Sequence, residues 1–128
     1  MRSIASVFIL GIILVLGSCR ADFETVASTG DLKFSKDTVY LDTVFTNIGS
    51  STFQLKVYNK SKNDINIPII QFEKGLNSKY RMTVDGQQGT AGKIFKDITL
   101  LAKDSLYIFI ETTASIADAN PTDFLYTD

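Results

Sequence analysis

From residue 32 onward, apolar and polar residues alternate in short segments separated by residues that favour turns. A period of two places alternate side chains on opposite faces of an extended chain, and so predicts half-buried β-strands. β-branched and aromatic residues dominate these segments, and none of them keeps the 3.6-residue period of an amphipathic helix. The predicted strands are residues 32–35, 39–45, 53–58, 65–72, 80–84, 95–101 and 106–111.

About seven short strands, with a turn every eight to twelve residues or so, are typical of an all-β fold, an antiparallel β-sandwich of the immunoglobulin (Ig) type. A small barrel is the alternative, because periodicity does not distinguish the two. Pro68 has no N–H to donate to a sheet, which predicts an edge strand or a bulge at that position. Phe95, Ile98 and Leu100 mark a strand whose period is imperfect.

The chain begins with one basic side chain, Arg2, followed by 13 uncharged residues at positions 4–16. As a helix, a run of this length reaches only about 20 Å, whereas the hydrocarbon core of a bilayer is about 30 Å thick. The run is therefore too short for a comfortable membrane span and is typical of the apolar region of a signal peptide. A buried core helix or a permanent anchor is the alternative.

The run ends in Leu16, Gly17, Ser18 and Cys19, which resemble the lipobox of bacterial lipoproteins. The resemblance implies that a signal peptidase recognises Leu16, Gly17 and Ser18, that diacylglycerol is attached to the Cys19 thiol, and that residues 1–18 are removed. Cys19 is the single cysteine of the chain and lies where the apolar run stops. The implied partner is a membrane, held through two or three acyl chains on Cys19, because one chain alone anchors only marginally.

Residues 19–31 are small and polar and are predicted to form a lipidated tether. Asp22 and Glu24 follow the cysteine closely, which resembles the surface-export signal of lipoproteins in the Bacteroidota. Position 20 is arginine rather than the aspartate of the usual inner-membrane retention signal. The resemblance implies a cell-envelope protein of the outer membrane, facing either the periplasm or the cell surface.

The strand segments carry a second, looser resemblance. Asp37-Thr38-Val39 and Gly49-Ser50 precede a strand that ends in Val57-Tyr58-Asn59. This order resembles the opening strands of Ig-like domains of the abnormal-spindle/hydin class and their secreted bacterial relatives. The resemblance covers about residues 32–70 and implies an Ig-like sandwich over residues 32–128. Such domains are mostly binding or spacer modules, and the family supplies no catalytic residue.

Residues 120–128 resemble the start of a further strand. A domain that ended within a strand would leave an open sheet edge. We therefore expect either a chain truncated at the C-terminus, the N-terminal stalk of a longer protein, or a sandwich completed by a short last strand.

The composition weighs against an enzyme. The chain has no histidine, which excludes Ser-His-Asp and Cys-His catalysis and imidazole ligands for zinc. A net charge of −1 gives no reason to expect nucleic acid. No cofactor or metal is predicted: Asp31, Asp37 and Asp42 lack the spacing of a calcium loop, and Asp85, Asp97, Asp104 and Glu111 are scattered over different turns and strands. A small hydrolase is thus the least favoured function.

Two short motifs are assigned to ordinary turns. Residues 86–93 end in Gly92-Lys93 but lack the first glycine of a phosphate-binding loop, since Gln87 stands there. We predict a flexible hairpin connection instead. Asn59-Lys60-Ser61 matches a glycosylation sequon, and in a bacterial lipoprotein we predict a turn.

The predicted function is a non-catalytic structural or interaction module on a lipid anchor. The alternative is a carbohydrate-binding surface lipoprotein in which exposed tyrosines form the ligand platform. Alternation places Tyr40 and Tyr58 opposite the core-facing residues, so these two are the candidate platform. The other tyrosines are Tyr80, Tyr107 and Tyr126. Packing across strands on the sheet surface is the competing explanation for these rings.

Overall fold

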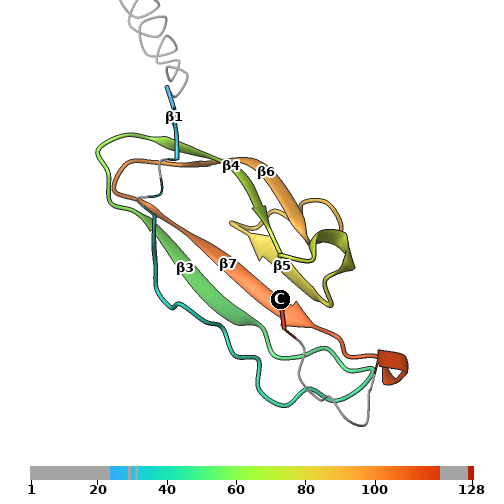
Figure 1. Ribbon diagram of the computed structural model, residues 1–128. Helices are drawn as coiled ribbons and strands as arrows, with labels where there is room; N and C mark the ends of the chain where they lie inside the picture. The colour runs from blue at the N-terminus through green and yellow to red at the C-terminus, as the bar shows by residue number, and fades with distance from the viewer. Residues whose placement is uncertain (1–23, 29, 31, 119–126) are drawn as a thin grey trace, which may run out of the picture.

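The computed structural model describes residues 24–28, 30, 32–118 and 127–128, and shows two β-sheets packed together (Figure 1). The sequence therefore adopts an all-β sandwich, as the alternation predicts. Seven strands are described: β1 (Val26–Ala27), β2 (Leu32–Phe34), β3 (Phe53–Asn59), β4 (Ile65–Gln71), β5 (Tyr80–Val84), β6 (Ile94–Leu100) and β7 (Ser105–Thr112). Two short 3₁₀ turns, Gly75–Asn77 and Ile116–Asp118, are the helical elements of the described residues.

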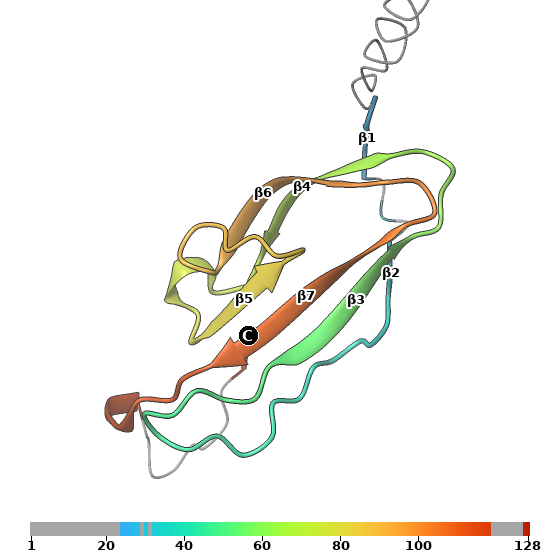
Figure 2. The same cartoon turned by 180° about the vertical axis from the view of Figure 1, so that it is seen from behind.

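One sheet has the order β1-β4-β6 and the other β2-β3-β7-β5. All neighbouring strands are antiparallel except β1 and β4, which run parallel. The centre of the larger sheet is the β3–β7 pair, in which Val57 lies opposite Leu106 and Leu55 opposite Ile108. Figure 2 shows the same two layers from behind.

The core lies between the two sheets, and each sheet contributes five buried apolar residues. Alternation along β3, β5 and β7 turns every second residue inward, as the sequence predicts. The buried residues are Ile65, Ile67, Phe95, Ile98 and Leu100 from the smaller sheet, and Val57, Met82, Val84, Leu106 and Ile108 from the larger one.

Strands β4 and β6 change face together at Pro68. The pairs Ile67–Ile98 and Ile69–Lys96 flank Pro68 and Asp97, so these two residues lie opposite each other without a break in register. Both positions, and also the next pair, Ile69 and Lys96, are exposed. Asp97 has a left-handed backbone, φ 53°, which accounts for the uneven spacing of Phe95 and Ile98. Strand β4 is the central strand of its sheet, so the prediction of an edge strand or a bulge is wrong for the strand as a whole. Pro68 is tolerated because β1 pairs only with Ile65 and Asn66, and no strand among the described residues lies beside Pro68 on that side.

The predicted strand at residues 39–45 is wrong. This segment runs alongside β3 in Figures 1 and 2 but forms no regular strand pairing. Isolated bridges follow it, between Thr46 and Ala114 and between Gly49 and Thr113. Phe45 is 71% exposed, so the alternating apolar side chains of this segment are not all directed into the core. Alternation alone did not show that the segment lacks a paired neighbour.

Two further predictions need correction. Residues 86–93 are not a hairpin, because β5 and β6 belong to different sheets and the segment crosses between them. The Met82 N–H donates a hydrogen bond to the Gly92 carbonyl oxygen (2.7 Å), which holds this crossing segment against β5. The antiparallel character is not complete either, since Val26 and Ala27, within the expected tether, pair in parallel with Ile65 and Asn66.

Candidate functional site

The predicted lipidation site lies outside the described residues. Leu16, Gly17, Ser18 and Cys19, like the rest of the predicted signal peptide at residues 1–18, belong to the part of the chain that the structure does not describe. Among the described residues, no helix has the length and apolar character needed to cross a bilayer. The described chain begins at Glu24, two residues before β1.

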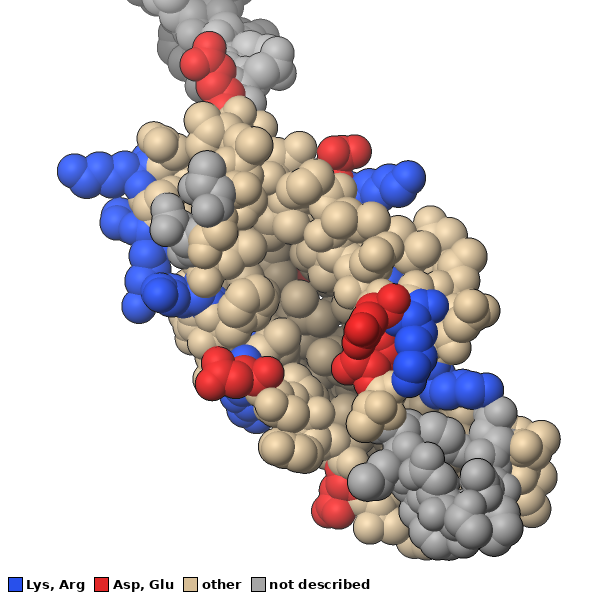
Figure 3. All heavy atoms as spheres, viewed as in Figure 1, with Lys and Arg blue, Asp and Glu red and all other residues tan. Residues whose placement is uncertain are grey.

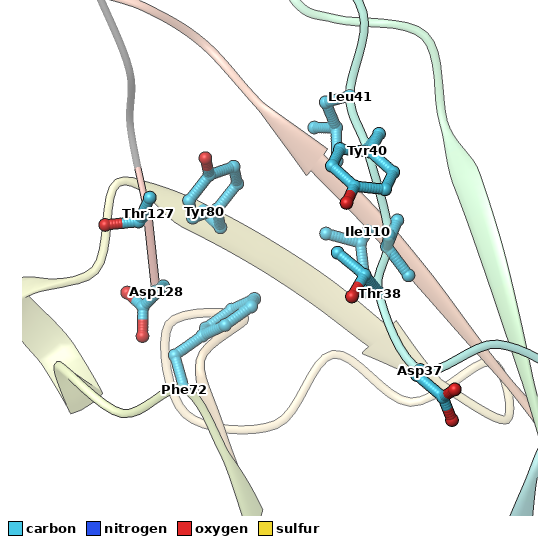
Figure 4. Close-up of a pocket in the computed structure, with 10 residues that line it drawn as sticks. Asp37, Thr38, Tyr40, Leu41, Phe72, Tyr80, Ile110, Thr127 and Asp128 are labelled. Carbon is cyan, nitrogen blue, oxygen red and sulfur yellow. The ribbon is translucent and has the colours of Figure 1, made fainter.

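Tyr40, one of the two predicted platform residues, lines a hollow of about 610 Å³. Figure 4 shows residues of the irregular segment 37–41 on one side of this hollow, with Ile110 of β7 beside them, and Phe72 and Tyr80 on the other side. The rings of Phe72 and Tyr80 are 6.0 Å apart. Tyr40 itself is 81% exposed, so its ring stands at the rim and is not packed into the hollow.

Tyr58, the second predicted platform residue, lies on the outer face of the larger sheet. It is half-buried and belongs to a row of side chains on β3 and β7. Tyr107 and Phe109 stack in this row, with ring centroids 6.1 Å apart and planes inclined by 17°. Lys56 of β3 extends its side chain toward both rings, with its Nζ 4.9 Å from the centroid of Tyr107 and 5.3 Å from that of Tyr58. We call Lys56, Tyr58, Tyr107 and Phe109 the aromatic row.

The aromatic row arises directly from strand geometry. Lys56 and Tyr58 are two residues apart on β3, and Tyr107 and Phe109 are two apart on β7, so each pair shares a face. Lys56 lies opposite Tyr107 in the register, which brings the ammonium over the ring. Such a cation–π contact is an electrostatic attraction between the ammonium and the face of the ring.

The neighbours of Lys56 favour its protonated form and raise the pKa of its ammonium. A side-chain hydrogen bond with Tyr107 raises the pKa of the Lys56 ammonium above 10.5, and burial lowers it by a smaller amount. Electrostatic interactions with Tyr107, Tyr58 and Asp104 raise the pKa further. The row therefore presents aromatic faces and a fixed positive charge, which can stack on a flat apolar ring face and donate to oxygen acceptors.

The structure does not bring the two predicted platform residues together. Tyr40 lines the hollow with Ile110, whose alternation along β7 with Phe109 places it on the inner face of the sheet. Tyr58 belongs to the outer face. One ligand therefore cannot stack on both rings at once, and the platform predicted from Tyr40 and Tyr58 divides into two separate surfaces.

Sequence reasoning missed Phe109 and Lys56. Both alternate with core residues, as Tyr58 does, so the signal was present in the sequence. What the sequence did not show was the register between β3 and β7, which sets Lys56 opposite Tyr107.

Asn59, the first residue of the sequon, has a structural role. It is 3% exposed, and its Nδ2 donates to the carbonyl oxygens of Asn63 (2.8 Å), Leu101 (3.0 Å) and Leu100 (3.2 Å). Its Oδ1 accepts from the Ser61 N–H (3.0 Å). A buried amide with this many partners is unavailable to a glycosyl donor. Asn59 is the last residue of β3 and not part of a turn, so the predicted turn is wrong at that position, and the Asn59 side chain fixes the loop that follows.

The carboxylates are dispersed over the described residues. No group of three or more Asp, Glu, His or Cys side chains among them could hold a metal ion. Glu111 forms an ion pair with Arg81 across β5 and β7 (Oε1 to Nε, 2.6 Å), and Arg81 Nη1 also donates to Thr113 Oγ1 (2.8 Å). This arrangement joins two strands at the sheet surface.

The chain matches no protein-family model, and searches of curated proteins and of solved structures found no match to it. Its function must therefore be inferred from its own residues and geometry.

Proposed function

We propose that the protein is a lipid-anchored lipoprotein of the bacterial cell envelope, in which a non-catalytic Ig-like sandwich serves as a structural or interaction module. The observation that carries the proposal is the sequence Leu16-Gly17-Ser18-Cys19 at the end of a 13-residue apolar run. This places the one thiol of the chain where a lipoprotein signal peptide is processed. Two or three acyl chains on Cys19 would hold the protein stably without a spanning helix.

The sheet order supports the Ig-like part of the proposal. The order β2-β3-β7-β5 corresponds to the A-B-E-D sheet of an Ig domain when β2 and β3 are taken as A and B, and β5 and β7 as D and E. Strand β4, which follows β3 and lies in the opposite sheet, then occupies the place of strand C. Strand β6 departs from that scheme, because it lies between β5 and β7 in the chain and pairs with β4.

The test is metabolic labelling with a fatty-acid analogue in bacteria that express the full chain. We expect label on the protein, and none on Cys19→Ala. Ser18→Ala is the matched control, because it keeps a small residue before the cysteine and should still be labelled. Absence of label on the unmodified chain, or equal label on Cys19→Ala, would overturn the lipid anchor.

We propose the outer membrane as the location, with the module facing the periplasm or the cell surface. Asp22 and Glu24 close to Cys19, together with Arg20 at the following position, support this location. Protease treatment of intact cells separates the two orientations: degradation without lysis indicates the surface, and protection indicates the periplasm. Recovery of the protein in the inner-membrane fraction would contradict the proposed location.

Carbohydrate binding is the second candidate function, and the aromatic row is the observation that favours it. Tyr107 and Phe109 stack at 17° to each other and offer ring faces, while Lys56 supplies a hydrogen-bond donor beside them. Sugars present apolar ring faces and hydroxyl acceptors, which match this combination of groups. Tyr40 takes no part in this surface.

A glycan array tests this candidate. We expect binding by the full chain to be lost in Tyr107→Ala and weakened in Tyr58→Ala. Tyr40→Ala is the control, since it removes an exposed ring on the other surface. Absence of any binding would remove the carbohydrate function, and equal loss in Tyr40→Ala would contradict its assignment to the aromatic row.

A further inference from the structure

The direction of β1 determines from which end the chain enters the sandwich. Because β1 is parallel to β4 and Val26 lies opposite Ile65, the first residue of β4, the chain reaches β1 from the end where β4 begins. Two loops close that end: residues 60–64 between β3 and β4, and residues 101–104 between β6 and β7 (Figures 1 and 2). We call them the basal loops.

The basal loops are joined to each other by hydrogen bonds. The buried Asn59 side chain donates to carbonyl oxygens of both loops, those of Asn63 and Leu101. Asp64 Oδ1 accepts from the Ala102 N–H (2.8 Å), which adds a second link. The Lys103 ammonium donates to the Lys60 carbonyl oxygen, which adds a third. The loops therefore form one continuous surface at the end where the chain enters.

Lysines are the most prominent charged groups of this surface. Lys60, Lys62 and Lys103 are all exposed, and Figure 3 shows basic side chains projecting along the margin where Figure 1 places the basal loops. The carboxylates of Asp64 and Asp104 instead accept backbone N–H groups, from Ala102 and Ser105 (2.8 and 2.7 Å), and so stay close to the backbone. Glu24, beside Lys62 in a shallow hollow, is the other acidic residue here.

The chain between Cys19 and β1 is short. Six residues lie between Cys19 and Val26, so an extended chain spans at most about 25 Å over the seven steps. A lipid on Cys19 would keep the start of β1 within that distance of the bilayer. The basal loops, at the same end of the sandwich, would then be the part of the domain closest to the headgroups.

We propose that the basal loops dock on the anionic phospholipid headgroups of the membrane that holds the anchor, through Lys60, Lys62 and Lys103. This inference rests on the proposed lipid anchor. The protein as a whole does not favour such contact, because removal of residues 1–18 leaves 12 basic and 14 acidic side chains in total. An orientation with the lysines toward the membrane brings their ammonium groups to the headgroups, and the sandwich would then stand upright on its basal loops.

The test measures lysine reactivity in reconstituted membranes. The full chain, expressed in bacteria and extracted from their membranes with detergent, is reconstituted with vesicles of phosphatidylethanolamine, with or without phosphatidylglycerol, and treated with an amine-acylating reagent. We expect acylation of Lys60, Lys62 and Lys103 to slow at least about threefold in the anionic vesicles, and to recover near 1 M salt, where screening acts within about 3 Å. Equal rates in the two kinds of vesicle would overturn the proposal.

A matched pair of variants distinguishes an effect of the lysines on the basal loops from an effect of the protein's total charge. Lys33, next to the basal end and opposite Tyr58, serves as a reporter lysine. Changing Lys60, Lys62 and Lys103 to Gln should abolish its protection in anionic vesicles. Changing Lys36, Lys74 and Lys96 to Gln removes the same charge elsewhere and should leave that protection in place; equal loss in both variants would contradict docking by the basal loops.

Flotation of the vesicles distinguishes the two proposals. Protein that fails to float with either kind of vesicle overturns the lipid anchor, and this inference with it. Protein that floats with both, but shows the same lysine reactivity in both, overturns docking by the basal loops and leaves the anchor standing.

Discussion

Asn59 Nδ2 lies 3.0 Å from the carbonyl oxygen of Leu101, and this bond joins two loops that are 42 residues apart in the chain. The same amide group also bonds to Asn63 and Leu100, so one side chain holds the ends of β3 and β6 together. Because Asn59 is 3% exposed, water cannot easily replace these bonds. The basal loops therefore owe their shape to a buried polar side chain and not to apolar packing alone.

Asn59→Ala should lower the free energy of unfolding by about 1–3 kcal/mol, because it leaves buried carbonyl oxygens without donors. Asn59→Asp should be at least as damaging, since it sets a carboxylate against the same carbonyl oxygens. Urea denaturation measures both changes. Asn63→Ala is the control, because only the backbone of Asn63 takes part, and a loss there equal to that of Asn59→Ala would contradict the role given to the Asn59 amide.

Gly89→Ala should be strongly destabilising. Gly89 has φ +56°, and a Cβ there would lie 2.5 Å from the Ile94 carbonyl oxygen and 2.6 Å from Cε1 of the buried Phe95. Gly86→Ala is the matched control, since Gly86 has φ +79° with nothing within 4 Å of a Cβ. The control should cost only the backbone strain, about 1 kcal/mol, and thermal unfolding should show a clearly larger loss for Gly89→Ala. Equal losses would contradict the close contact with Phe95.

Substitutions of Asp97 test whether its left-handed backbone lets β4 and β6 change face together at this point. Its left-handed backbone suits glycine and opposes β-branched residues, so Asp97→Val should lower stability by about 1–2 kcal/mol, while Asp97→Gly should be neutral or better. Thermal unfolding of both variants supplies the comparison. A stable Asp97→Val would mean that β6 runs through this position as an ordinary strand.

We expect the Lys56 ammonium to lose its proton at a higher pH than an ordinary lysine does. The hydrogen bond with Tyr107 raises the pKa of its ammonium above 10.5, so folding favours the protonated form. The resulting stabilisation is complete at pH values below 10.5 and is lost as the pH rises through the folded-state pKa. Nuclear magnetic resonance of the lysine side chains should show Lys56 titrating at higher pH than in Tyr107→Phe, which lacks the hydroxyl group. An unchanged titration in that variant would exclude this hydrogen bond as the cause.

Alternation was sufficient to predict most of the strands and the all-β class, because inward and outward positions differ so clearly along β3 and β7. It failed at residues 39–45, where the pattern alternates but the backbone has no regular strand pairing. A period of two reports which side chains share a face, and not whether a neighbouring strand exists. The uneven spacing of Phe95 and Ile98 was visible, but its cause, the left-handed Asp97 opposite Pro68, required the structure.

The candidate sites, like the strands, could be predicted from the sequence only in part. The exposed tyrosines were predictable one at a time, whereas the stacking of Tyr107 with Phe109 and the position of Lys56 depend on long-range register. Likewise, Lys60, Lys62 and Lys103 belong to one surface because Asn59 joins the two loops that carry them. Contacts between residues more than 40 positions apart are set by the fold, and local sequence patterns do not encode them.

The intact mass of the protein extracted from bacterial membranes tests the central claim most directly. We predict a chain that begins at Cys19 and carries the added mass of a diacylglyceryl group, with or without a further acyl chain on its amino group. A chain that retains residues 1–18, or one that begins elsewhere with an unmodified Cys19 thiol, would contradict the lipid anchor and the membrane orientation derived from it.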